Sequence, residues 1–380
     1  MATRLLDGRP VETITAFLFH RGSHTNPQTL AQNAGKSFVG SYVLGMGFTF
    51  DDSDTKGVAT PLAEMQRLIA AFPPNQEVIF PFIGGAELNT DPSHAHHRYV
   101  INFGERSEAE CRQRWPDLMA IVEAKVKPER MQNNREGYRR YWWQYGEKRV
   151  ELWKAIAPLS RILANSQVST YLAFAFLPTR MVYAHTLNVF ALTTYSAFCA
   201  LQSQPHEIWA RFFASSLGDG LRYTPSDCFE TYPFPANWEQ DAALEAAGKA
   251  YYEYRAALMQ RSNAGLTKIY NRFHDLYDHD PEIEELRTLH TAMDRAVLDA
   301  YGWTDIPTAC EFLLDYEIDE AEWGSKKKPY RYRWPDAVRD EVLARLLERN
   351  AQYAHAEQLV GMTAKKKGKV GGMADMFGGG

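Results

Sequence analysis

Cysteine is scarce in this sequence. Four cysteines occur in 380 residues, and no two of them form a CxxC pair; they are Cys111, Cys199, Cys228 and Cys310. Widely spaced cysteines provide neither a disulfide framework nor the ligand pairs of a structural zinc site. We therefore expect free thiols, as in a cytoplasmic protein.

Long hydrophobic runs are absent as well. No uninterrupted apolar stretch reaches the roughly 20 residues that a membrane-spanning helix needs. The N-terminal sequence MATRLLDGRP also lacks an apolar core of signal-peptide length. The sequence therefore predicts neither a membrane anchor nor secretion.

The net charge of −5 gives no overall signal for nucleic acid, but the charges are unevenly distributed. Residues 125–149 contain eight basic and three acidic side chains, whereas residues 275–322 contain fifteen acidic and two basic ones. One part of the surface is thus suited to phosphate and another repels it.

Two clusters of possible metal ligands lack the rest of a site. His94, His96 and His97 have no acid or thiol at a suitable spacing, and residues 275–280 lack the glycine and the closing glutamate of an EF-hand. We expect no metal at either cluster, and a solvated helix end at the acids.

Two short motifs resemble enzyme signatures only by their letters. Residues 44–48, LGMGF, have the first two glycines of a nucleotide loop but not the third, which favours a tight bend. Residues 116–125 spell a PD-(D/E)xK-like pattern on one predicted amphipathic helix, whereas nucleases take these acids from neighbouring strands around a metal.

The best-organised part of the chain is residues 171–235. Residues 171–177 and 181–192 are rich in aromatic and β-branched side chains, which predicts a buried strand pair. A helix follows, with Thr193 or Thr194 as its cap and Pro205 as a kink or break. Residues 215–224 then form a polar, turn-prone loop on this rigid support, where function often lies.

Helical spacing dominates after Pro235. We expect helices starting at Asn237, across residues 283–301, and at 308–317 and 335–358. A basic and aromatic patch between the last two is a second candidate for phosphate contact; it contains Lys326, Lys327, Lys328, Tyr330, Arg331, Tyr332, Arg333 and Trp334. The composition of the tail predicts disorder. The fold class is therefore α+β, with a lead-in (1–33), a mixed α/β domain (34–235), an all-helical domain (236–360) and a tail (361–380).

Several stretches are similar, in order, to one bacterial protein family. They are AGKSFVGSYVLGMGFTFDD, PFIGGAELN, HRYVINF, WPDLMAIVEAKVKPER, YWWQYGEKR and RYTPSDCFETYPFP. Together they resemble the target recognition domain of MmeI-like (type IIG/IIL restriction-modification) adenine-specific DNA methyltransferases, and the match covers roughly residues 8–350.

This resemblance implies that the chain recognises a double-stranded DNA sequence within a restriction-modification or phage-defence system. The family places its cofactor site and catalytic motif upstream of this region, and no adenine-methylase tetrapeptide occurs here, Asn26-Pro27-Gln28-Thr29 being the nearest. We therefore expect no catalytic residue and no cofactor on this chain, with S-adenosylmethionine bound by a separate methyltransferase subunit in the prokaryotic cytoplasm. The alternatives are an interaction protein or gene remnant that docks on a methyltransferase without reading DNA, and an enzyme with an unrecognised site.

Residues 215–224 are the predicted site of base readout. Arg pairs with guanine and Asp with the amino group of cytosine, so Asp219 and Arg222 are the leading candidates, with Tyr223 and Thr224 beside them. A structural tie from Arg222 to Asp227 or Glu230 is the open alternative.

Contacts to the DNA backbone are predicted at basic residues, most of them beside aromatic ones. The candidates are Lys125, Lys127, Arg130, Arg135, Arg139, Arg140 and Arg180. Cations provide sequence-independent attraction to phosphate, while a core helix with solvated arginines explains the same pattern equally well.

Overall fold

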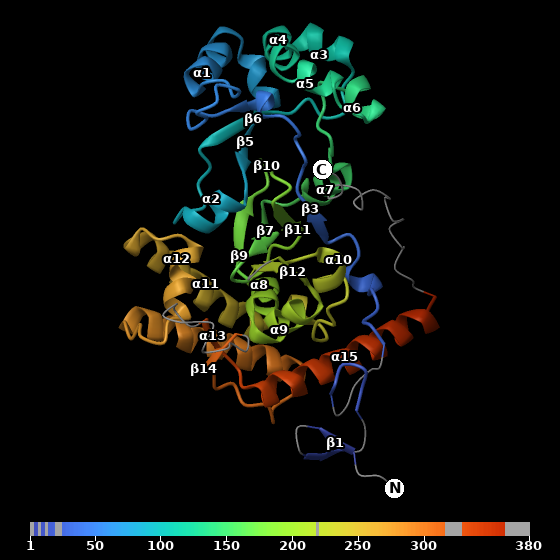
Figure 1. Ribbon diagram of the computed structural model, residues 1–380, viewed down its shortest axis with the longest axis vertical. Coiled ribbons are helices and arrows are strands. Elements are labelled where there is room, and N and C mark those ends of the chain that lie inside the picture. The colour runs from blue at the N-terminus through green and yellow to red at the C-terminus, as the bar shows by residue number, and fades with distance from the viewer. Residues whose placement is uncertain are drawn as a thin grey trace, which may run out of the picture.

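The chain folds into two lobes stacked along its longest axis (Figure 1). The computed structural model describes residues 4–6, 9–11, 14–19, 25–217, 220–315 and 329–361, so the predicted tail lies almost wholly outside these ranges. Helices and small sheets occur in both lobes, so the predicted α+β class is confirmed. No helix within these ranges is long and apolar enough to cross a membrane.

The upper lobe is built on a four-stranded sheet in the order β10-β5-β6-β4. In this sheet β10 runs parallel to β5, and the other pairs are antiparallel. The strands are β4 (Thr49–Phe50), β5 (Ile79–Ile83), β6 (Arg98–Ile101) and β10 (Val182–Tyr183). The helices of this part of the chain are α1 (Leu62–Ala71), α2 (Gly85–Thr90), α3 (Glu108–Arg114), α4 (Pro116–Lys125), α5 (Lys127–Met131) and α6 (Glu136–Arg140).

Sequence signals set the limits of these helices. Ser107 followed three residues later by Glu110 is a sequence signature that predicts a helix start, and the Ser107 hydroxyl does cap α3, accepting a hydrogen bond from the Glu110 amide at 3.2 Å. Pro116 and Pro128 lie in the first turns of α4 and α5, where a missing N–H costs nothing. Residues 108–131 therefore form three short helices, with a proline in the first turn of the second and of the third.

The lower lobe contains an antiparallel sheet in the order β3-β11-β7-β9. Its strands are β3 (Ser37–Val39), β7 (Arg161–Ser166), β9 (Phe174–Pro178) and β11 (Leu187–Phe190). The two predicted strands at 171–192 exist, but the expectation that they pair with each other was wrong. Both pair with β7, on its opposite sides, while β10 between them joins the upper sheet.

The lobes are joined by backbone ladders. The Gly40 amide donates to the Leu187 carbonyl at 2.9 Å, and the Ser41 amide donates to the Tyr183 carbonyl at 2.8 Å. An added Cβ at Gly40 would lie 2.1 Å from the Ala184 carbonyl oxygen, so this close approach requires glycine. At the junction between the lobes, the backbone at Gly40 and Ser41 therefore packs closely against the backbone at residues 183–187.

Helices α7 (Val150–Ile156), α8 (Tyr195–Gln202), α9 (Gln204–Phe213) and α10 (Pro225–Cys228) belong to the lower lobe. Thr194 caps α8, and its hydroxyl accepts a hydrogen bond from the Ala197 amide at 3.2 Å. The helix is interrupted at Ser203, shortly before Pro205, as predicted. A small third sheet has the order β12-β13-β8, with β8 (Val168–Ser169), β12 (Ser215–Leu217) and β13 (Gly220–Arg222).

The C-terminal region is helical, with α11 (Ala242–Ser262), α12 (Leu266–Phe273), α13 (Pro281–Ala300) and α15 (Asp336–Leu359). Asp241 caps α11, because Asn237 precedes a separate 3-10 turn. One hydrophobic core runs from the lower sheet through α8 into these helices, and α11 packs on α8 where Gly248 lies against Tyr195. The predicted boundary after Pro235 is therefore not a break in the core.

Two local predictions were wrong. Residues 311–314, expected in a helix, form β14 (Glu311–Leu314), which pairs with β15 (Tyr330–Arg333). The sequence offers residues 13–19 as a further strand candidate, but the described residues 14–19 form a turn instead, with the Thr15 hydroxyl accepting from the Phe19 amide. Upstream, β1 (Arg4–Leu6) pairs with β2 (Arg9–Val11).

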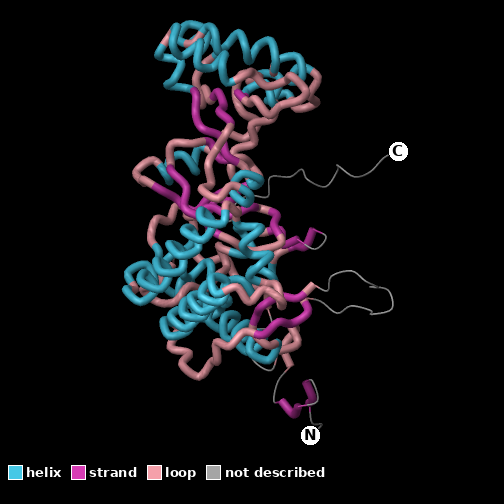
Figure 2. The backbone as a smooth tube through the Cα atoms, turned by 90° about the vertical axis from the view of Figure 1, so that its left-hand side faces the viewer, coloured by secondary structure: helices cyan, strands magenta, loops and turns pink. Residues whose placement is uncertain are grey.

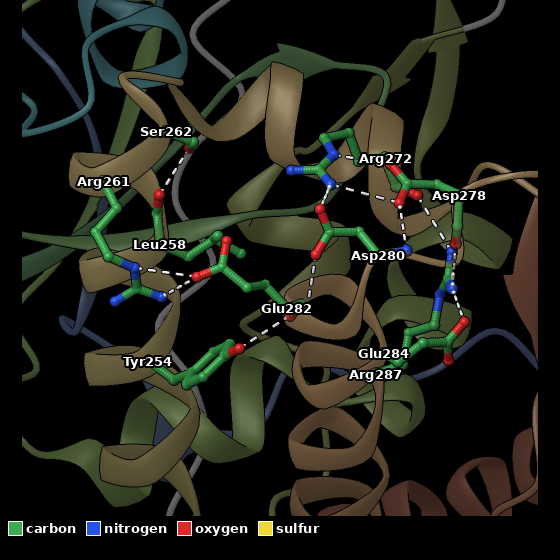
Figure 3. Close-up of polar contacts among 10 residues, drawn as sticks. All are labelled: Tyr254, Leu258, Arg261, Ser262, Arg272, Asp278, Asp280, Glu282, Glu284 and Arg287. Carbon is green, nitrogen blue, oxygen red and sulfur yellow. Dashed lines mark hydrogen bonds and ion pairs between the residues drawn. The ribbon is translucent and has the colours of Figure 1, made fainter.

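The acidic loop before α13 is neutralised by arginines (Figure 3). Arg272 lies between Asp278 at 2.8 Å and Asp280 at 2.9 Å, and Arg287 contacts Glu284 at 2.7 Å. Asp280 also caps α13. Within the described ranges, no group of three or more His, Cys, Asp or Glu side chains is arranged to hold a metal ion.

Candidate nucleic-acid interface

The three-stranded sheet β12-β13-β8 carries the leading readout candidate, Arg222, whose side chain is partly exposed. Arg222 on β13 lies opposite Ser215 on β12 and opposite Val168 on β8. Figure 2 shows short strands of the lower lobe projecting beyond its helices. Asp219 lies outside the described residues, so only its neighbours can be placed.

Alternation along β13 and the two residues after it separates outward from inward side chains. Leu221 and Tyr223 are buried, whereas Arg222 and Thr224 are partly exposed. In the described part of the chain, the Arg222 guanidinium forms no hydrogen bond or ion pair, so the alternative tie to Asp227 or Glu230 is not made there. A cation held on a short strand with free donors suits recognition of a base edge.

Tyr223 is a correction to the readout set, because it is a core residue. It is 1% exposed, and its hydroxyl contacts Nε2 of His206 at 3.0 Å. Burial lowers the pKa of His206 to about 3, which keeps the imidazole neutral. The Tyr223 carbonyl accepts from the amide of Asn188 at 3.1 Å, so this residue anchors the end of β13 and has no surface for a base.

A cleft of 760 Å³ lies between the lobes and reaches the third sheet. Gln167 and Val168 at β8 form one end, and Val168 is the direct neighbour of Arg222 in the sheet. Tyr42 and His185 form part of the wall, with their rings 4.6 Å apart and nearly perpendicular. The cleft and the β13 surface are therefore adjoining parts of one face.

The lining of the cleft also includes polar groups that hydrogen bonds and ion pairs hold in place. Arg98 forms an ion pair with the buried carboxylate of Glu87, which also accepts from the Gly84 amide at 3.1 Å. The Asn89 side chain donates to the Ser166 hydroxyl at 2.8 Å. Fixed hydrogen-bonding groups on an apolar wall are typical of sites that orient a ligand.

The seven residues predicted to contact the DNA backbone fall into three groups. Two of them, Lys125 and Arg130, donate hydrogen bonds to carbonyl groups of the protein. The Lys125 ammonium donates to the Val58 and Ala59 carbonyls at 2.9 and 2.8 Å. Arg130 is 1% exposed and donates to the Val43 and Gln144 carbonyls at 2.9 and 3.1 Å. Arg130 therefore cannot reach a phosphate in this conformation, and we remove it from the set.

Two further residues, Lys127 and Arg139, are partly engaged. Lys127 pairs with Glu123 at 2.7 Å and lies over the Trp142 ring, while Arg139 donates to the Asn133 carbonyl at 2.5 Å. Both keep exposed surface, but their charges are partly committed to intramolecular contacts.

Arg135, Arg140 and Arg180 are the exposed cations of the set. Arg135 contacts the Tyr138 hydroxyl at 3.0 Å, and Arg140 lies beside the Tyr141 ring. Among the residues that the structure describes, no acid forms an ion pair with any of these three guanidiniums. They are therefore the best placed to meet phosphate groups.

Sequence reasoning missed most of the residues of this face. Tyr42, Gln167 and His185 line the cleft, and they come from three separate segments that only the fold brings together. The inward orientation of Tyr223 had a usable signal, because Leu221 and Tyr223 alternate with polar neighbours. No local sequence pattern predicts that Arg130 is buried.

The middle of the chain matches a known protein family. Residues 39–236 match a family model described as "MmeI, target recognition domain". None of the curated proteins matches the chain.

A solved structure has a similar fold. It is described as the "Structure of Type IIL restriction-modification enzyme MmeI in complex with DNA", with a TM-score of 0.58 and 17% sequence identity. The similarity covers 91% of this chain and 39% of that chain, so this chain spans well under half of its length. Because the family model covers more than half of the residues, the predicted resemblance is confirmed, and the chain belongs to the MmeI target recognition domain family.

Proposed function

We propose that this chain is the DNA sequence recognition module of an adenine-N6 methyltransferase in a restriction-modification or phage-defence system. A separate chain supplies methyl transfer and binds S-adenosylmethionine. The main support for this proposal is the position of Arg222. It lies on β13 beside the interlobe cleft, and its guanidinium forms no ion pair with another described residue. Family membership adds weight to the proposal.

In this proposal, Arg222 donates two hydrogen bonds to O6 and N7 of a guanine in the major groove. Asp219, the nearest acid before it in the sequence, accepts from the amino group of a cytosine, and Thr224 contacts a neighbouring base. Arg135, Arg140 and Arg180 bind phosphates and fix the register without reading sequence. The lobes then hold the duplex against the face formed by the cleft and β13.

Selection from a random-site DNA library tests this function. Wild-type protein should select a defined site, and Arg222→Lys should lose about 1 to 3 kcal/mol on that site and relax preference at one base position. Lys154→Ala is the control, because Lys154 is an exposed cation on α7 that pairs with Glu151 at 3.0 Å. This control should leave the selected site unchanged.

Three outcomes would contradict the proposal. If the wild type selects no site and binds all DNA equally weakly, the chain is better explained as an interaction protein that docks on a methyltransferase. If Arg222→Lys keeps the wild-type site and affinity, base readout lies on other residues. Methyl transfer by the purified chain alone would show that the catalytic assignment is wrong.

A further inference from the structure

Strand β8 is an edge strand of the three-stranded sheet β12-β13-β8, called the readout sheet from here on, and it is short. Its two residues, Val168 and Ser169, pair with Arg222 and Leu221 of β13. A sheet of two- and three-residue strands has little stability of its own, so its position depends on what holds its edge. The residues directly after β8 are therefore important for where Arg222 points.

Two arginines converge on the carbonyl that follows β8. The Thr170 oxygen accepts from Nη2 of Arg211 at 3.0 Å and from Nη2 of Arg331 at 3.3 Å. Arg211 comes from α9, whereas Arg331 comes from β15, 161 residues beyond Thr170 along the chain. The C-terminal region thus reaches back to the edge of the readout sheet.

Each arginine is itself fixed by an acid. Nε and Nη2 of Arg331 donate to the two carboxylate oxygens of Asp315 at 2.9 and 2.8 Å, and Nε of Arg211 donates to Glu207 at 2.7 Å. Arg331 is 5% exposed. Burial raises the pKa of Asp315, but the Arg331 guanidinium outweighs it and holds this pKa below its ordinary value, so the pair is ionised at neutral pH.

The next residue is clamped from the same side. The Tyr171 ring is stacked on His274 at 4.9 Å, its hydroxyl donates to Asn271 at 2.9 Å, and the Arg331 guanidinium lies 5.4 Å from its centroid. His274 and Asn271 belong to α12 and its end. Arg331 was a candidate for phosphate contact in the sequence, but its buried guanidinium faces these groups instead. The lysines of the same predicted patch, residues 326–328, lie outside the described ranges.

We propose that Arg331 and Arg211 are positioning residues for base readout: by holding the Thr170 carbonyl, they fix β8 and, through it, the direction of Arg222. This inference rests on the proposed DNA-reading function. It assigns the C-terminal region a part in sequence specificity without any contact to DNA.

Arg331→Lys and Arg211→Lys in the full chain test this inference. Lysine keeps the positive charge but cannot bridge a carboxylate and a carbonyl with a planar fork. Affinity for the site selected by the wild type should fall on the order of 10-fold, with relaxed preference at the base that β13 reads. Binding to unrelated DNA and the salt dependence should stay unchanged, because no phosphate contact is lost.

Arg345→Lys is the matched control. Arg345 makes the same kind of bidentate pair, with Asp305 at 2.8 and 2.5 Å, and also contacts Glu341, but it lies on α15 and not at the readout sheet. This variant should keep the selected site. Amide hydrogen exchange provides a second measurement: the amides of 168–170 and 220–222 should exchange faster in the two test variants, and those of the β7–β9 ladder should not.

The possible results distinguish a failure of this inference from a failure of the proposed DNA-reading function. Unchanged site preference and unchanged exchange in both test variants overturn the inference, while a defined wild-type site still supports DNA reading. A uniform loss of affinity with a smaller salt slope would mean that Arg331 meets phosphate, and an equal change in Arg345→Lys would mean general destabilisation; either result overturns the inference. If the wild type selects no site, the proposed function fails, and exchange alone decides whether the arginines hold β8.

Discussion

Replacing Gly40 by Ala should separate the two lobes at their junction. The new Cβ would lie 2.1 Å from the Ala184 oxygen and 2.7 Å from the Tyr183 oxygen, both backbone atoms that cannot rotate away. Ordinary contact begins near 3.4 Å, so the two backbones must move apart by about 1 Å. Such a shift strains the hydrogen bonds from the Gly40 and Ser41 amides.

The size of the effect follows from those bonds. Each is worth about 0.5 to 1.5 kcal/mol, and overpacking of a tight site adds about 1 to 3 kcal/mol. We therefore expect Gly40→Ala to lower the free energy of unfolding by about 2 to 6 kcal/mol. Since Ser41 and Ala184 line the interlobe cleft, binding to the selected DNA site should weaken in the fraction that remains folded.

Urea unfolding and DNA titration measure the two effects. Gly137→Ala is the matched control, because Gly137 lies within α6 with nothing inside 4 Å of its added Cβ. This control should be neutral or stabilise the chain by up to about 1 kcal/mol. The reasoning fails if Gly40→Ala unfolds at the wild-type urea concentration, since the junction would then be loose enough to accept a methyl group.

Three further predictions concern charge, pH and a buried amide. Arg140→Ala should reduce the slope of log affinity against log salt by about 0.9 for every DNA sequence, whereas a changed base preference would contradict the phosphate assignment. Burial lowers the pKa of His94 to about 4 and that of His206 to about 3, so these groups stabilise the fold above their ordinary pKa of 6.5 and the stability is lost as the pH falls towards the lowered values. This loss of folding free energy approaches about 1.4 kcal/mol per pH unit for each histidine. In thermal melts across about pH 4 to 6.5, the stability of His206→Gln should therefore decline less steeply with falling pH than that of the wild type. An equal decline would refute the lowered pKa of His206. Asn188→Ala should cost about 2 to 4 kcal/mol in urea unfolding, because it leaves the buried Asn165 and Tyr223 oxygens without their shared donor, and a loss below about 1 kcal/mol would mean that water replaces it.

Local signals in the sequence determined the family, the fold class and many element limits. Ser107 and Thr194 are the helix caps that their sequence contexts predict, and the prolines at 116 and 205 lie where helices restart. Caps and proline constraints act within one turn of the chain, so they can be recognised without knowing the fold. The stretches that resemble the MmeI target recognition domain likewise keep their order along the chain, and the family match at 39–236 confirmed them.

Only the tertiary structure decided which strands pair and which charges face solvent. β7 was not predicted at all, although β9 and β11 both bond to it, because strand pairing depends on contacts distant in sequence. Arg130, Arg331 and Arg140 look alike as letters in basic, aromatic segments. The first is buried on carbonyls, the second is buried on an acid that follows β14, and the third remains at the surface, because the cost of burying a guanidinium is offset only where the fold brings acceptors to it.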